Sequence, residues 1–175
     1  LAIAEEKASE KLASNPATKA LVSILLLADH QVQAGLSGLS DSLKMEWDDD
    51  EDREALAKLH SGIGDWFHIS ARAFTSSKDR TRILPILANA SREYKKALSI
   101  NPQDKATARK LRTISKVAIK LYPSVNNMLM LGGAYILCDD TNNATRCYDL
   151  ALTKDPGNRL ARKGKSFCKK NRRDI

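Results

Sequence analysis

The chain has 175 residues and a formal net charge of +8, from 29 Lys and Arg against 21 Asp and Glu. A chain of this length buries about 70% of the surface that its unfolded form exposes, so it needs neither a metal nor a disulfide to fold. Its longest apolar segment, residues 20–28, is much shorter than the ~20 residues that cross a bilayer. Because glycines and prolines are few, the composition predicts a soluble all-α protein.

Helical periodicity, interrupted by proline, glycine and asparagine, predicts a series of helices along the chain. Before residue 125 they cover residues 2–13, 17–34, 49–75, 80–100 and 105–121. Gly62 and Gly64 are expected to kink or divide the helix over 49–75, and Asp79 is expected to cap the next helix. The segment from Gly35 to Ser40 is rich in glycine and serine, which predicts a flexible loop.

Residues 125–158 have the pattern of a helical hairpin. Small residues allow two antiparallel helices to approach closely, and two tyrosines fill the space beside those contacts. Residues 139–143 have turn chemistry, with Asn or Thr available as helix caps, and a proline ends the second helix. The residues that set this packing are Met128, Leu131, Gly132, Tyr135, Ala144, Tyr148, Ala151 and Pro156.

With Val125 as its first position, this hairpin resembles a tetratricopeptide repeat (TPR). Seven of the eight characteristic positions match, and Met128 replaces the usual tryptophan. A degenerate repeat precedes it, because Tyr94 and Pro102 fit a second repeat helix while the first helix, counted from Ala71, does not fit. The resemblance implies a right-handed stack of antiparallel helix pairs with a concave binding face and a solvated last helix over residues 159–171.

Charge divides the chain into two regions. Residues 1–79 carry 8 Lys and Arg and 14 Asp and Glu, for a net charge of −6. Residues 80–175 carry 21 Lys and Arg and 7 Asp and Glu, for a net charge of +14. We therefore predict an acidic, divergent helical region over 1–79 and a basic TPR-like region over 80–175 that ends in a capping helix.

The basic residues of the second region recur every three or four positions and so form two helical stripes. These are Lys105, Arg109, Arg112, Lys116 and Lys120 on one helix, and Arg162, Lys165, Lys169 and Arg173 on the last helix. Two interpretations are open. The stripes are either solvated outer faces or a binding surface for an acidic protein segment, an anionic membrane or nucleic acid.

The resemblance implies a non-enzymatic protein-interaction module, a scaffold or adaptor that binds a peptide or helix of a partner protein. Its groove is predicted at Asn126, Leu129, Met130, Gly133, Ile136, Lys163 and Phe167. The alternative is an electrostatic binder of nucleic acid or of an anionic membrane surface through the basic stripes. A third possibility is self-assembly, with the acidic region of one copy against the basic region of another.

No pattern in the sequence indicates catalysis, a cofactor or a metal site. Cys138, Cys147 and Cys168 are spaced neither as a metal site nor as a disulfide framework. An odd number of cysteines and the lack of a secretory signal favour a cytoplasmic protein. The predicted partner is another protein with an acidic or amphipathic segment.

Overall fold

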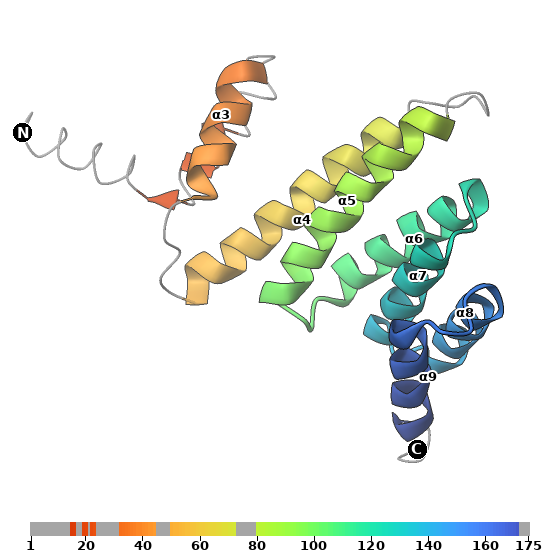
Figure 1. Cartoon of the computed structure of the whole chain (residues 1–175). Helices are drawn as coiled ribbons and strands as arrows, with labels where there is room; N and C mark the ends of the chain where they lie inside the picture. The colour runs from red at the N-terminus through yellow and green to blue at the C-terminus, as the bar shows by residue number, and fades with distance from the viewer. Residues whose placement is uncertain are drawn as a thin grey trace, which may run out of the picture. The chain divides into compact units, whose positions relative to one another are not determined.

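The computed structural model describes residues 15–16, 19–20, 22–23, 32–44, 50–72 and 80–171 (Figure 1). Every regular element among these residues is a helix, which confirms the all-α prediction. The chain forms two compact units, Leu1–Leu59 and His60–Ile175, whose boundary falls inside one helix. The predicted helix over 2–13 lies outside the described residues.

The first unit corrects one prediction. The segment from Gly35 to Ser40 is not a loop but part of helix α3 (Val32–Ser42). Gly38 packs so closely on Ser23 that a Cβ atom at residue 38 would overlap the Ser23 Oγ, which donates to the Lys19 carbonyl. Glycine serves here for close approach between helical segments and not for flexibility.

Helix α4 (Asp50–Arg72) crosses the boundary between the units and continues without a break through Gly62 and Gly64. It is followed by α5 (Arg80–Ile100) and α6 (Lys105–Leu121), both with the predicted bounds. Asp104 caps α6 by accepting from the backbone N–H groups of Ala106 and Thr107. The predicted cap at residue 79 lies outside the described residues.

The predicted hairpin consists of α7 (Val125–Leu137) and α8 (Thr141–Lys154), followed by α9 (Arg159–Asn171). The cap of α8 differs from the prediction, since Asp140, and neither Asn nor Thr, accepts from the Asn143 backbone N–H. Asp139, just before it, has a φ of 60°. Aspartate tolerates this left-handed conformation better than most residues, which explains an acidic residue at the turn.

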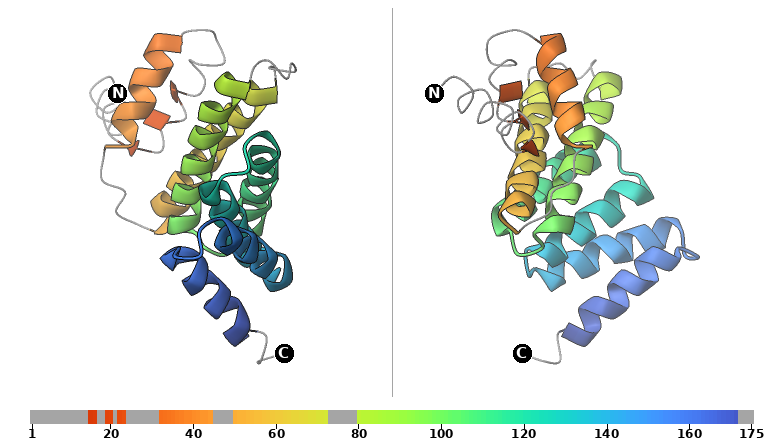
Figure 2. Two further views of the ribbon diagram at one scale, coloured as in Figure 1. Left: turned by 45° about the vertical axis from the view of Figure 1, so that its right-hand side comes forward. Right: turned by 90° about the vertical axis from the view of Figure 1, so that its left-hand side faces the viewer.

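Consecutive helices of the second unit pack as antiparallel neighbours, from α5 against α6 to α8 against α9 (Figure 2). Alternate helices also meet: Asp65 of α4 pairs with Lys110 of α6, Ser91 of α5 bonds Met130 of α7, and α7 contacts α9. The unit therefore has two layers, one with residues 60–72 of α4, α6 and α8, the other with α5, α7 and α9.

The hairpin core has the packing predicted from its small residues. Ala144 and Ala151 are fully buried, and Met128 and Leu131 are also buried. The Tyr148 ring lies between Gly132 of α7 and Gly164 of α9, where a Cβ atom on either glycine would overlap it. Two glycines thus allow three helices to pack around one aromatic ring.

The buried face of α9 is narrow. Ala161 and Cys168 are fully buried, whereas Leu160 and Phe167 are 66% and 46% exposed. Residues at positions 161, 164 and 168 lie on one side of a helix, so this side faces α8, and Leu160 and Phe167 lie at its edge.

Candidate functional site

A cleft of about 300 Å³ lies between α5 and α7, with α6 beneath it. Helix α6 contributes the small side chain of Ala118, which is 3% exposed, and so leaves space between the two helices above it. The cleft is lined by Leu84, Leu87, Ala88, Ser91, Arg92, Lys95, Ala118, Asn127 and Met130.

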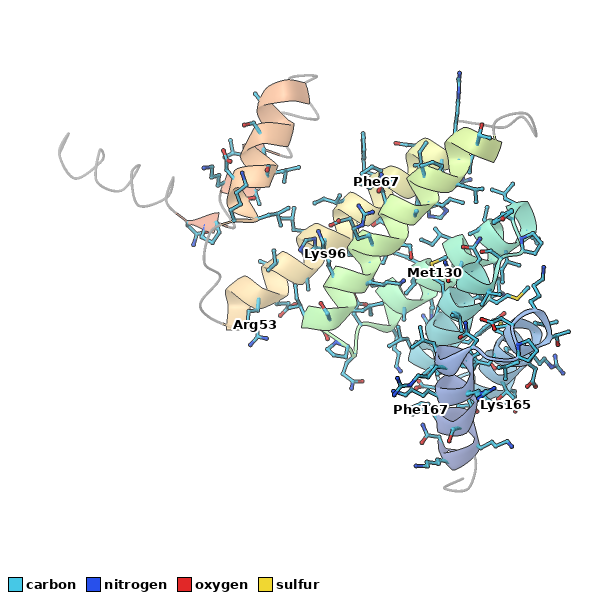
Figure 3. All side chains as sticks on the ribbon, viewed as in Figure 1. Arg53, Phe67, Lys96, Met130, Lys165 and Phe167 are labelled. Carbon is cyan, nitrogen blue, oxygen red and sulfur yellow. The ribbon has the colours of Figure 1, made fainter. Side chains whose placement is uncertain are left out.

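Hydrogen bonds hold the α7 side of the cleft in place. The Ser91 hydroxyl donates to the Met130 sulfur at 2.8 Å, which fixes the thioether between α5 and α7 (Figure 3). The Asn127 amide donates to the Tyr122 carbonyl at 2.7 Å and so ties the start of α7 to the end of α6. A cleft with fixed walls loses less conformational entropy when a ligand binds.

The cleft is apolar at one end and basic at the other. Leu84, Leu87 and Ala88 lie towards the start of α5, and Arg92 and Lys95 lie towards its end. All of its described lining residues are neutral or basic. Arg92 donates to the Asn89 side chain and is otherwise exposed, and neither cation is part of an ion pair within the described chain.

The structure separates the residues of the predicted groove. Met130 lines the cleft, whereas Leu129 and Ile136 pack into the core cluster of α7, α8 and α9. Asn126 is exposed, and a Cβ atom added to Gly133 would meet open space. Lys163 and Phe167 are exposed on α9 and do not line the cleft.

Much of the predicted stripe on α6 is engaged within the molecule. Lys105 pairs with Asp139 at 2.6 Å, and the cationic groups of Arg112 and Lys116 lie 5.9 and 5.6 Å from the centre of the Tyr135 ring. Arg109 and Lys120 are exposed.

The turn between α7 and α8 lies close to this stripe. A side-chain hydrogen bond from Asn143 lowers the pKa of Asp140, and the positive charges of Arg112 and Lys116 act in the same direction. The turn therefore supplies negative charge to the basic face of α6.

The stripe on α9 is also partly engaged. Lys165 pairs with Asp149 of α8 at 2.5 Å, and the Arg162 guanidinium donates to the Pro156 carbonyl at 2.7 Å. Lys169 is exposed, and Arg173 lies outside the described residues. Lys165 and Phe167 lie on opposite sides of α9 (Figure 3), so the ion pair and the exposed aromatic ring belong to different faces.

A polar network that the sequence analysis did not identify joins α4, α5 and α6. Asp65 accepts from the Tyr94 hydroxyl at 2.8 Å and from the Lys110 ammonium at 2.6 Å. Burial raises the pKa of Tyr94 far above its ordinary value, and the hydrogen bond to Asp65 adds to this shift. The network continues through Ser61, Thr107 and Asp104.

Next to this network, the His60 ring nitrogen Nδ1 lies 2.7 Å from the Glu93 carboxylate, which also accepts from Lys96 at 3.0 Å. Burial lowers the pKa of His60, while Glu93 opposes this effect. Asp65 is 29 and 45 positions from Tyr94 and Lys110, and His60 is 33 positions from Glu93, so no local motif indicates these contacts.

The described part of the chain contains no group of three or more His, Cys, Asp or Glu side chains that could hold a metal ion. The three cysteines are free thiols, and burial raises the pKa of Cys147 to about 11, with a contribution from Asp140. None of the described helices is long and apolar enough to cross a membrane.

No protein-family model matches the chain, and comparison with curated proteins gives no match. The fold therefore stands as an all-helical arrangement of sequential antiparallel pairs.

Proposed function

We propose that this chain is a non-enzymatic protein-interaction module with TPR-like helix pairs, and that it binds a peptide or helix of a partner protein. The observation that carries the proposal is the cleft between α5 and α7, which has an apolar floor and fixed walls. Clefts of this kind between helices are recurrent binding sites for peptide segments.

The site that we propose differs from the groove predicted from the sequence. Leu129 and Ile136 contribute to the core, so a charged substitution there would damage the fold as well as any groove. Met130 is the one residue of the predicted groove that lines the cleft. The binding surface is therefore centred on Met130 and extends along α5.

A steric block of the cleft tests this proposal. Ala88 is exposed and lines the cleft, so Ala88→Trp fills the site without replacing a core residue. Ala106 is also exposed but lies in the first turn of α6 outside the cleft, so Ala106→Trp is the matched control.

Proteins captured from a cell lysate by the purified chain are compared between the two variants, after nuclease treatment and at moderate salt. We expect a set of proteins that the unmodified chain and Ala106→Trp retain and that Ala88→Trp loses. Circular dichroism confirms that both variants keep their helix content. Identical capture by Ala88→Trp would contradict the assignment of the cleft.

Electrostatic binding through the basic stripes is the second candidate function. It is favoured by α9, which has cations but no acidic residue among Arg159–Asn171. Among the described residues, its one ion pair joins Lys165 to Asp149. Binding of this kind weakens steeply as salt rises, in proportion to the number of phosphates contacted. Capture that disappears with nuclease or at moderate salt would favour it.

A further inference from the structure

We infer that the cleft between α5 and α7 selects a partner segment that has an apolar side chain at one end and acidic side chains at the other. The inference rests on the proposed function and adds the chemistry and polarity of the ligand. It depends on how the lining residues of α5 are ordered along the helix.

The lining residues of α5 change from apolar to basic along its length. Leu84 and Leu87 precede Ser91, and Arg92 and Lys95 follow it. Leu84 is eight positions before Arg92, and Leu87 is eight positions before Lys95. Eight positions correspond to about 12 Å along the helix axis. The cleft thus presents an apolar contact and a positive charge at a fixed separation.

This separation sets the spacing expected in the ligand. An extended peptide advances roughly 3.3–3.6 Å per residue, so 12 Å corresponds to three or four residues. The apolar side chain would lie against Leu84 or Leu87, and a carboxylate three or four residues away would reach Arg92 or Lys95. A cleft of about 300 Å³ accommodates one or two side chains and not the face of a whole helix.

Charge complementarity identifies the ligand as acidic. Within the described chain neither Arg92 nor Lys95 is part of an ion pair, in contrast to Lys96, which pairs with Glu93. Glu93 is buried on another side of α5 and is already shared by His60 and Lys96. A carboxylate from a partner would therefore meet two cations that no acidic residue of the described chain pairs with at the cleft.

Selection from a random twelve-residue peptide library displayed on phage tests the inference. The unmodified chain is the bait, and each selected peptide is then measured against four variants by fluorescence anisotropy. Ala88→Trp and Ala106→Trp report on the cleft. The double variant Arg92→Gln/Lys95→Gln removes its charge, and Arg109→Gln/Lys120→Gln makes the same change on exposed residues of α6.

We expect selected peptides to contain an acidic residue three or four positions from an apolar one. Replacement of that acidic residue by its amide should weaken binding about fivefold, as expected for partly exposed ion pairs. In Arg92→Gln/Lys95→Gln the difference between acid and amide should fall below about twofold, while Arg109→Gln/Lys120→Gln should preserve it.

Two other outcomes would distinguish failure of the inferred ligand chemistry from failure of the proposed function. Peptides that lose binding in Ala88→Trp but show no acidic preference would overturn the inference and leave the proposed function intact. Peptides that bind Ala88→Trp as well as Ala106→Trp, or a selection that yields no binding peptide, would contradict the proposed function and the inference together.

Discussion

Two buried tyrosines pack on glycines in the second unit, in different surroundings. Tyr94 of α5 lies on Gly64 of α4, and its hydroxyl joins the charged network of Asp65 and Lys110. Tyr148 of α8 lies between Gly132 and Gly164, in a cluster that also contains Ala144, Ala151, Ala161 and Cys168. Both contacts place a tyrosine ring on a glycine of a neighbouring helix. One lies beside a polar network and the other lies within an apolar core.

The difference shows whether ring packing or hydrogen bonding contributes most to the stability of each contact. In the apolar cluster the fit of the ring between two glycines is the main constraint, so added volume is costly. In the α4–α5 contact the ring fit and the hydrogen bonds act together, so loss of a carboxylate is also costly. Substitutions that change volume or charge alone can separate these contributions.

The largest effect is expected from added volume beside Tyr148. A Cβ atom at Gly132 would lie 2.8 Å from the Tyr148 ring, and Gly164 holds the ring from the other side. Gly132→Ala should lower the free energy of unfolding by about 2 kcal/mol, measured by urea denaturation.

Its control is the next residue in the chain. Gly133 has open space beside it, so Gly133→Ala should raise the free energy of unfolding by roughly 0.5–1 kcal/mol through helix propensity alone. Equal changes in the two variants would show that Tyr148 does not constrain the helix packing.

A smaller effect is expected from loss of charge in the α4–α5 region. Asp65→Ala leaves the buried Tyr94 hydroxyl without its acceptor and Lys110 without its counter-ion, and should lower the free energy of unfolding by about 1–2 kcal/mol. Asp149→Ala removes a more exposed ion pair with Lys165 and should cost less than about 1 kcal/mol. If the two variants unfold at the same urea concentration, the network does not contribute beyond a surface ion pair.

Much of the fold follows from local signals in the sequence. The bounds of α5, α6 and α9 match their predicted ranges because proline, asparagine and capping residues end helices locally. The segment from Gly35 to Ser40 was predicted wrongly because glycine also permits close packing, which depends on a distant residue, Ser23.

The α4–α5 contact was missed for a related reason. Gly64 and Tyr94 are 30 positions apart in the chain, whereas Gly132 and Tyr148 are 16 positions apart. The helices of the first pair have 23 and 21 residues, against 13 and 14 in the second. At the 34-residue period the predicted first helix starts at Ala71, which leaves Gly64 outside the repeat.

The candidate cleft was predicted only at Met130. Its other lining residues come mainly from α5. The 34-residue repeat pattern makes α5 the second helix of one repeat and α7 the first helix of the next matched repeat. A single helix, α6, separates α5 from α7 and places both in one layer. Whether two helices share a layer depends on how many helices lie between them in the chain, and no local motif indicates this.

The smallest effect concerns pH. Burial lowers the pKa of His60, and also that of His68, from the ordinary value of 6.5. Below pH 6.5 the unfolded chain therefore binds more protons than the folded one. The free energy of unfolding should be fully retained above pH 6.5 and fall as the pH drops towards the lowered pKa, by at most about 1.4 kcal/mol per pH unit for one histidine.

Urea denaturation at pH 7.5 and 5.5 measures this effect, with His60→Gln as the variant that makes the pH dependence shallower. An unchanged dependence in His60→Gln would assign it to His68 or to other groups.

A comparison of Gly64→Ala with Gly62→Ala tests whether α4 and α5 pack through the contact between Gly64 and Tyr94. A Cβ atom at Gly64 would lie 2.6 Å from the Tyr94 ring, whereas one at Gly62 would meet nothing within 4 Å. We expect Gly64→Ala to lower the thermal midpoint and Gly62→Ala to raise it, in the same directions as expected for Gly132→Ala and Gly133→Ala in the other pair. If Gly64→Ala and Gly62→Ala are equally stable, α4 and α5 do not pack through a contact between glycine and tyrosine of the kind that joins α7 and α8.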